Sequence, residues 1–172
     1  CSGWALFRLS DEKLLGVGKL RSLSTKVPLN QRYEDLQRKI ESIFDGVSLC
    51  DRDALICEAP TTMRDPRAAF KVEQVRGIFE TLARARSVQT PGRLNPRSVH
   101  KEVLGLKGKQ LPRAEIKSMA CHVVMRLFSE PLQTLGFEPE VENLARHQDI
   151  VDAILIGYLG LSRLKTASLA EE

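Results

Sequence analysis

The sequence predicts an α/β domain in which a mixed β-sheet is flanked by helices. Near the N-terminus, residues 4–9 and 14–20 predict two antiparallel strands joined by a turn at 10–13. Further strands then alternate with helical patterns, an order typical of a sheet that also contains parallel strands. With 172 residues, 42% of them hydrophobic, we expect one domain over residues 1–164 and a mobile C-terminal tail over 165–172.

The middle of the chain has clear helix and strand signals. Apolar residues at helical spacing predict a helix that begins near Asn30. Residues 54–58 form a short apolar run that predicts a buried strand ending at Glu58, just before a proline. Asp65 and Pro66 are typical of the N-cap and first turn of a helix, which should reach about residue 86. We expect its buried side to hold Phe70, Val75, Ile78, Phe79 and Leu82, with a close packing contact at Gly77.

The second half of the chain is predicted to be mostly helical. The elements expected there are a short strand at 87–89, helices over 96–104, from Pro112 or Arg113 to about Phe128, and over 148–164, and irregular chain over 129–146.

Two carboxylates lie in the last predicted helix. Asp152 interrupts the apolar run of residues 150–159, and Asp149 precedes it by three positions, so both project from one face. A helix that is apolar nearly all round belongs in a core, where a carboxylate is costly unless a cation or hydrogen bonds compensate it. Paired oxygens on a rigid helix suit a hard divalent cation. The alternative is that Asp149 is a helix N-terminal acid and that Asp152 pairs with an Arg or Lys.

Glu58 is the third candidate ligand. It stands at the end of the predicted central strand, and functional groups of α/β sheets collect at the carboxyl ends of strands. Together with Asp149 and Asp152 it forms a set of oxygen donors suited to a metal site. The alternative is a solvated glutamate at a strand end.

A basic segment favours nucleic acid as a partner. Residues 93–117 carry a net charge of +5, more than the formal +4 of the whole chain. Such a patch suits electrostatic phosphate contacts that weaken with salt, although a solvated basic face is the alternative. The candidate DNA-binding residues are Arg93, Arg97, Lys101, Lys107, Lys109, Arg113 and Lys117.

Five segments resemble, in order, the RuvC group of Holliday-junction resolvases within the RNase H-like nuclease superfamily. Ser2-Gly3-Trp4-Ala5-Leu6-Phe7 resembles the family's second strand, and Leu55-Ile56-Cys57-Glu58 its central strand with the catalytic Glu. Residues 68–77, with their Arg-Gly pair, resemble the following helix. Val103-Leu104-Gly105 resembles the segment before the family's basic loop, and residues 149–153 resemble the acidic start of its last helix. The resemblance covers residues 1 to about 164.

The resemblance implies an RNase H-like fold whose first strand is absent from the chain, which begins at Cys1. In the family that strand ends in a fourth metal-binding Asp, and we expect a preceding stretch that carries it. The resemblance also implies a homodimer that cuts four-way DNA junctions with Mg²⁺ (Mn²⁺ is a possible substitute), with two ions per site. Glu58, Asp149 and Asp152 would be the ligands, and His147 an outer ligand, a base or a plain surface residue.

Two family lysines that stabilise transition-state charge correspond most closely to Lys101 and Lys109, with His100, Arg113 and Lys117 as the alternative positions. The alternative function is a catalytically inactive RNase H-like module that binds branched DNA. The residue before Cys1 discriminates the two, because an Asp there favours the enzyme. An RNA-cleaving relative on the same fold is a third alternative.

Cysteines and hydropathy indicate a reduced, non-membrane protein. The cysteines at 1, 50, 57 and 121 form no C-x-x-C pair, and their spacing to the histidines does not suit zinc. We therefore expect free thiols in a cytosolic-type compartment. No apolar run has the length of a membrane span.

Overall fold

The computed structural model describes residues 2–60, 65–106, 111–138 and 140–171, with residues 169–171 described by their backbone alone. The chain divides into two compact units. Unit 1 comprises Leu20–Asn95, and unit 2 comprises Ser2–Lys19 and Pro96–Glu172. The single domain predicted from the sequence stays a prediction, because two contact units can fold cooperatively as one domain.

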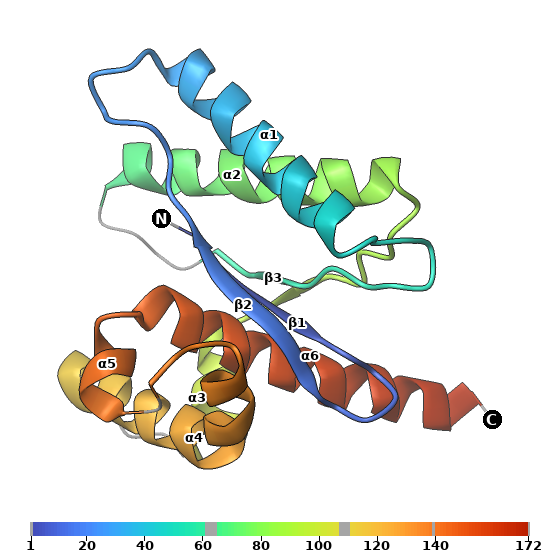
Figure 1. Ribbon diagram of the computed structural model, residues 1–172, viewed down its shortest axis with the longest axis vertical. Helices are drawn as coiled ribbons and strands as arrows, with labels where there is room; N and C mark the ends of the chain where they lie inside the picture. The colour runs from blue at the N-terminus through green and yellow to red at the C-terminus, as the bar shows by residue number, and fades with distance from the viewer. Residues whose placement is uncertain (1, 61–64, 107–110, 139, 172) are drawn as a thin grey trace. The chain divides into compact units, whose positions relative to one another are not determined.

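Unit 2 contains a strand pair that lies along a long helix. The strands β1 (Ser2–Phe7) and β2 (Leu14–Leu20) are hydrogen-bonded neighbours, which confirms the predicted pair (Figure 1). Their turn is closed by the N–H of Arg8, which donates to the carbonyl of Lys13 at 2.9 Å. β1 packs along α6 (Gln148–Glu171), which extends beyond the predicted end at residue 164.

Glycines permit the close approach of β1 to α6. A Cβ atom built on Gly3 would lie 1.8 Å from the backbone carbonyl oxygen of Asp149. A Cβ atom on Gly157 would lie 2.6 Å from Cε2 of Phe7. Strand and helix therefore meet at a separation that only glycine tolerates at these two positions.

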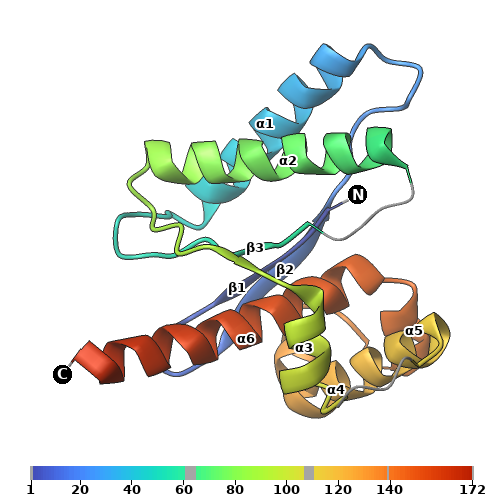
Figure 2. The ribbon, with the colours of Figure 1, turned by 180° about the vertical axis from the view of Figure 1, so that it is seen from behind.

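Three further helices complete unit 2. α3 (Pro96–Glu102) confirms the predicted short helix and packs against α6 (Figure 2). α4 (Arg113–Thr134) begins where predicted and has a kink at Phe128, whose φ of −132° is not helical. The helix resumes after the kink, and Pro131 is tolerated because it lies in the first turn after the break. The prediction of irregular chain over 129–146 is therefore wrong, since α4 reaches Thr134 and α5 spans Val141–Ala145.

Unit 1 is built on two helices that lie side by side in both ribbon views (Figures 1 and 2). α1 (Leu29–Gly46) buries Leu36, Ile40 and Phe44. α2 (Pro66–Ala85) begins as predicted, because the side chain of Asp65 accepts a hydrogen bond from the backbone N–H of Arg67 at 2.9 Å. The rings of Phe44 and Phe79 join the two helices with centroids 6.2 Å apart.

Two details of α2 contradict the sequence prediction. Phe70 is 63% exposed rather than buried, and it lies in the second turn of the helix, near its N-terminal end. Gly77, expected at a close contact, would meet no atom within 4 Å if it carried a Cβ atom. Phe70 and Gly77 are seven residues apart on one side of α2, where Gly77 is half-buried and Gln74 between them accepts a hydrogen bond from the hydroxyl of Tyr33.

The described part of the chain has two two-stranded sheets, which confirms a mixed α/β arrangement with small sheets, and one mixed sheet flanked by helices stays a prediction. β3 (Cys57–Glu58) pairs in parallel with β4 (Arg93–Leu94), and a parallel bridge joins Ala54 to Gln89. The ladder between these contacts is interrupted because Pro91 has no N–H to donate and Gly92 has a φ of +134°. The strand predicted at 87–89 is thus reduced to this bridge.

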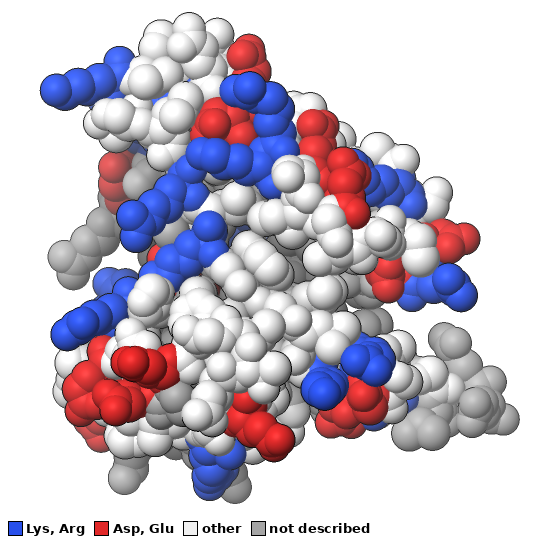
Figure 3. All heavy atoms as spheres, in the orientation of Figure 1, with Lys and Arg blue, Asp and Glu red and all other residues white. Residues whose placement is uncertain are grey.

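The surface charge, the cysteines and the hydropathy of the helices complete the description of the fold. On the face seen in Figure 3, acidic and basic side chains are interspersed over α1, so this helix presents mixed charge. Cys50, Cys57 and Cys121 are free thiols, as expected. Among the described residues, no helix is long and apolar enough to cross a membrane.

Candidate functional site

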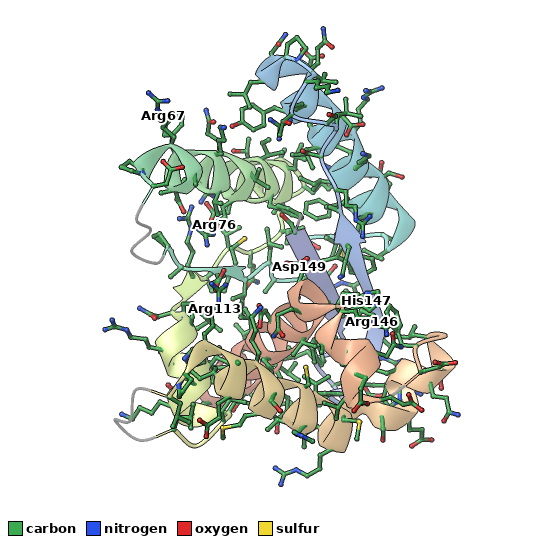
Figure 4. All side chains as sticks on the ribbon, turned by 90° about the vertical axis from the view of Figure 1, so that its left-hand side faces the viewer. Arg67, Arg76, Arg113, Arg146, His147 and Asp149 are labelled. Atoms are coloured by element: carbon green, nitrogen blue, oxygen red, sulfur yellow. The ribbon has the colours of Figure 1, made fainter. Side chains whose placement is uncertain are left out.

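Glu58 ends β3, at the position expected from the sequence. Nη2 of Arg76 lies 3.3 Å from Oε2 of Glu58 and 3.4 Å from the carbonyl oxygen of Ala59. Figure 4 shows Arg76 pointing from α2 toward β3. The Arg76 side chain is 11% exposed and that of Glu58 is 41% exposed, so a nearly buried guanidinium presents its N–H to a carboxylate that reaches solvent.

The contacts of Arg76 continue into a network of ion pairs in unit 1. Nη1 of Arg76 lies 2.6 Å from Glu73, and Nη1 of Arg93 lies 2.6 Å from the other oxygen of Glu73. Arg93 also holds both oxygens of Glu80, at 2.6 and 3.0 Å. Hydrogen bonds from Arg93 lower the pKa of Glu73 and Glu80, and the two carboxylates raise the pKa of Arg93. The guanidinium of Arg93, a candidate phosphate contact, is therefore engaged within the fold.

The thiol of Cys57, next to Glu58, is unreactive at neutral pH. Burial, and after it the charge of Glu80, raise the pKa of its thiol to about 11. The thiol is protonated at neutral pH, so it offers neither a nucleophile nor a metal-binding thiolate under those conditions.

Asp149 and Asp152 lie in the first turns of α6, in unit 2. The buried face of α6 is formed by Ile150, Val151, Ile154 and Leu155, each at most 2% exposed. Asp152 lies on the opposite side and its side chain is exposed, contrary to the expectation of a carboxylate inside the core. The reason is that α6 is apolar on most of its surface but not on the stripe that begins at Gln148.

The environment of Asp152 is nevertheless unfavourable to its charge. Partial loss of hydration raises its pKa, and the like charge of Asp149 raises it further. A hydrogen bond from Nε2 of Gln148, 3.0 Å from Oδ1, and the charges of Lys117 and His100 lower it. The side chain of Asp152 still reaches solvent. Its loss of hydration is therefore partial and comes from neighbouring protein atoms that displace some of its water. A bound cation would relieve both the desolvation and the repulsion.

His147 precedes α6, and Figure 4 shows it beside Arg146 and Asp149 at the start of this helix. Its carbonyl accepts hydrogen bonds from the N–H groups of Ile150 and Val151, and its ring meets Phe137 edge-on with centroids 5.7 Å apart. These contacts give His147 a packing role in unit 2. A chemical role for it stays a prediction.

The remaining basic candidates belong to unit 2. Arg97 and Lys101 lie on α3, and Arg113 and Lys117 lie in the first turns of α4, all four with exposed side chains. Lys107 and Lys109 lie outside the described residues. Lys117 and His100 come within electrostatic reach of Asp152, so α3, α4 and α6 bring basic and acidic candidates together.

The three carboxylates fit a magnesium ion by their chemistry. All three are hard oxygen donors, which Mg²⁺ prefers, and Asp149 and Asp152 repel each other as a ligand pair would in the absence of metal. Within each unit, the described residues contain no group of three or more His, Cys, Asp or Glu side chains that could hold a metal ion. A site made of Glu58, Asp149 and Asp152 therefore stays a prediction.

Sequence reasoning missed two residues of this region. Arg76 is the charged partner of Glu58, and the only signal for it was the Arg-Gly pair in the segment that resembles the RuvC helix. Gln148 is the hydrogen-bond partner of Asp152, and its spacing of four residues on a helix is a usable signal.

Comparison with known solved structures gives a fold class for the chain. No protein-family model and no curated protein sequence matches the chain. The fold is a mixed α/β arrangement, rich in helices and with small sheets, that resembles the RuvC fold. One similar solved structure is T. thermophilus RuvC in complex with Holliday junction substrate, with a TM-score of 0.56 and 17% sequence identity. The match covers 87% of this chain and 80% of the RuvC chain.

Proposed function

We propose that this protein is a structure-selective DNA endonuclease that resolves four-way junctions by divalent-metal-dependent phosphodiester hydrolysis. The observation that carries the proposal is the likeness of its fold to RuvC in complex with a Holliday junction, over most of both chains. An RNase H-like fold is part of the proposal. The chemistry of the site supports it, since carboxylates stand at the end of β3 and at the start of α6.

Glu58, Asp149 and Asp152 are the proposed ligands for two Mg²⁺ ions, with Mn²⁺ as a substitute. When bound, the metal activates water and stabilises the leaving oxygen of the phosphodiester. Asp149 and Asp152 offer oxygens from one helix face, and the hydrogen bond from Gln148 and the charges of Lys117 and His100 oppose the rise in the pKa of Asp152. Lys101 and Lys109 are the proposed electrostatic partners of the transition-state charge.

The proposed DNA contacts are electrostatic. Exposed basic side chains on α3 and at the start of α4 suit phosphate oxygens, whose contacts give affinity that falls steeply with salt. Arg97, Lys101, Arg113 and Lys117 are proposed for this role together with Lys107 and Lys109. Arg93 is a weaker candidate because Glu73 and Glu80 hold its guanidinium.

A homodimer built on α2 is the proposed assembly. Ala83 is the one residue of α2 that is fully buried, Phe70 is 63% exposed, and a Cβ atom at Gly77 would meet nothing within 4 Å. A partner helix can approach closely at a glycine and cover the aromatic ring. Phe79 packs on Phe44 within the subunit and is not part of this surface. A two-fold dimer suits a junction that is cut in symmetric pairs of strands.

Cleavage of a synthetic four-way junction is the direct test of the proposed activity. The full protein should nick the junction in Mg²⁺ or Mn²⁺, leave a linear duplex of the same sequence intact, and be inactive in EDTA. Glu58→Gln and Asp152→Asn should each abolish cleavage while junction binding persists, because a ligand is lost and a negative charge is removed beside the phosphate. Glu130→Gln, an exposed acid on α4, is the matched control and should cleave normally.

The outcomes separate the two candidate functions. Cleavage by Asp152→Asn at the parent rate would refute the metal mechanism. Junction binding without cleavage by the parent would refute the enzyme and favour the catalytically inactive module that binds branched DNA. Failure of the parent to prefer a junction over duplex would refute both.

Salt dependence tests the basic segment. Replacing Lys107 and Lys109 together with Gln should reduce the slope of log affinity against log salt by about two units, about one for each lost phosphate contact. Arg93→Gln should leave this slope nearly unchanged, because its charge is compensated within the fold. An unaltered slope for the double variant would contradict the proposed interface.

Sedimentation tests the dimer. The parent should sediment as a dimer at tens of micromolar, and Phe70→Glu should shift it to monomer, because a charge replaces the apolar contact. Lys71→Glu, the exposed neighbour on a different side of α2, is the control and should remain a dimer. A parent that is monomeric at this concentration would contradict the assembly.

A further inference from the structure

The contacts around Glu58 form a closed circuit in unit 1. Glu58 of β3 meets Arg76 of α2, Arg76 meets Glu73, and Glu73 meets Arg93 of β4. The circuit closes through the backbone, because β4 is the parallel partner of β3 and Arg93 stands opposite Cys57 in the register. A circuit that closes through a strand pair restricts each member more than an isolated ion pair would.

Within this circuit the guanidinium of Arg76 is fixed before it reaches Glu58. Its short contact, 2.6 Å, goes to Glu73, and Nη2 is also 3.4 Å from the carbonyl oxygen of Ala59. On its other side Glu73 accepts a hydrogen bond from Arg93, at 2.6 Å. Arg93 is itself held in place because it also donates to both oxygens of Glu80. Arg76 is thus braced by a side chain on its own helix and by the backbone of the strand end.

The contact with Glu58 is the longer one, at 3.3 Å, and it involves a single carboxylate oxygen, Oε2. An N–H placed on one oxygen sets the rotation of a carboxylate without holding both of its oxygens. A bidentate grip, such as Arg93 has on Glu80, would instead commit the whole carboxylate to the ion pair. The geometry of Arg76 therefore suits orientation of Glu58 rather than neutralisation.

We infer that Arg76 is a positioning residue, which orients the carboxylate of Glu58 toward a divalent cation, and that Glu73 and Arg93 brace it. The inference rests on the proposed function, since it needs Glu58 to be a metal ligand. Nothing in the sequence alone indicates it, because the four side chains are spread over 36 positions, from 58 to 93, and meet only through the β3–β4 pair.

Mn²⁺ affinity, measured by the fraction of free Mn²⁺ in electron paramagnetic resonance, is the test that does not depend on activity. Arg76→Gln should weaken Mn²⁺ binding by roughly 10-fold to 100-fold, the range for residues that orient metal ligands. Junction cleavage should shift to a higher Mn²⁺ requirement by a similar factor and recover at saturating Mn²⁺. Arg76→Lys should rescue little, because one ammonium does not span Glu58, Ala59 and Glu73 together.

The sign of the Arg76→Gln effect, compared with that of Glu73→Gln, distinguishes orientation from neutralisation. If Arg76 orients Glu58, loss of its brace weakens Mn²⁺ binding, in the same direction as Arg76→Gln. If Arg76 neutralised Glu58, Arg76→Gln would tighten Mn²⁺ binding while Glu73→Gln weakened it. Opposite signs for the two variants would therefore overturn the inference.

Arg86→Gln is the matched control for a merely structural effect. Arg86 also joins a carboxylate, Asp45 at 2.7 Å, to a backbone carbonyl, that of Leu82 at 3.4 Å, but lies at the other end of α2. It should leave Mn²⁺ affinity unchanged. Equal losses in Arg86→Gln and Arg76→Gln would overturn the inference. If Arg76→Gln does not fold, Arg76→Lys decides it, because it keeps the positive charge and loses the shared geometry, and an unchanged Mn²⁺ affinity in that variant would overturn the inference.

The behaviour of the parent protein separates failure of the proposed function from failure of the role inferred for Arg76. A parent that binds no Mn²⁺ overturns the proposed function and this inference with it. A parent that binds Mn²⁺ and cleaves junctions, with Arg76→Gln indistinguishable from it, overturns only the role of Arg76.

Discussion

Replacing Gly3 with Ala should damage the protein more than adding a methyl group at Gly16, Gly18 or Gly157. The added Cβ would lie 1.8 Å from the carbonyl oxygen of Asp149 and 2.3 Å from its carbonyl carbon. To restore ordinary contact at 3.4 Å, β1 and the start of α6 must separate by about 1.6 Å. Both atoms belong to the backbone, so no side-chain rotation relieves the clash.

The expected loss of unfolding free energy is about 3 kcal/mol or more, the upper end of the range for overpacked cores, because two rigid elements have to move. For a chain of 172 residues this corresponds to a decrease in Tm of roughly 6 to 12 °C. Thermal unfolding at one fixed protein concentration measures it, and a fixed concentration avoids a shift caused by dimerisation. Cleavage should fall as well, since the movement displaces Asp149.

Gly46→Ala is the control for the effect of the methyl group itself. A Cβ at Gly46, in the last turn of α1, meets nothing within 4 Å, so this variant should gain up to about 1 kcal/mol through helix propensity. If Gly3→Ala melts within about 2 °C of the parent, a difference below 1 kcal/mol for this size, the close approach of β1 to α6 is refuted.

Three further predictions concern charge and protonation. In the absence of metal, Asp152→Asn should raise unfolding free energy by about 0.5 kcal/mol, because a repulsive pair on one helix face is removed, and a decrease would contradict the desolvation that raises this pKa. The pKa values of Glu73 and Glu80 are lowered in the fold, so the stability that these two carboxylates contribute is present above pH 4.5 and is lost as the pH falls through their folded pKa values. Between pH 6 and pH 3, the Tm of Arg93→Gln should therefore fall less steeply than the Tm of the parent. Cys57, with a pKa near 11 against an ordinary 9.0, should react with iodoacetamide at pH 8 about 100-fold more slowly than in the urea-unfolded chain, and equal rates would show that its thiol is not desolvated.

Local signals in the sequence are sufficient where a single element decides the structure. The N-cap at Asp65 and the turn after β1 depend on a few neighbouring residues, and the structure confirms both. The placement of Glu58 at a strand end and of Asp149 in a first helical turn has the same local origin. Element starts are therefore more predictable than element ends, as the continuation of α4 past Phe128 and of α6 past residue 164 demonstrates.

Features that depend on distant partners could not be predicted. The apolar neighbours of Asp152 predict a core position, but which side of α6 is covered depends on β1, α3 and α4. Periodicity also predicts that Phe70 is buried, although α1 covers only part of α2. The pairing of Arg93 with Glu73 and Glu80 places a basic residue of the expected DNA surface inside an ion-pair network, which no linear charge count can reveal.

The dual composition of α6 links folding and chemistry in one element. Its buried face includes Ile150, Val151 and Ile154, and the candidate ligands Asp149 and Asp152 are interleaved with these residues along the same turns. In a mutational scan of α6, substitutions on the buried face should therefore lower abundance and activity together. Variants that keep full abundance but lose activity should be confined to the narrow stripe of Asp149 and Asp152. Such a scan would test, without any structure of a complex, whether Asp149 and Asp152 form a catalytic face of the helix.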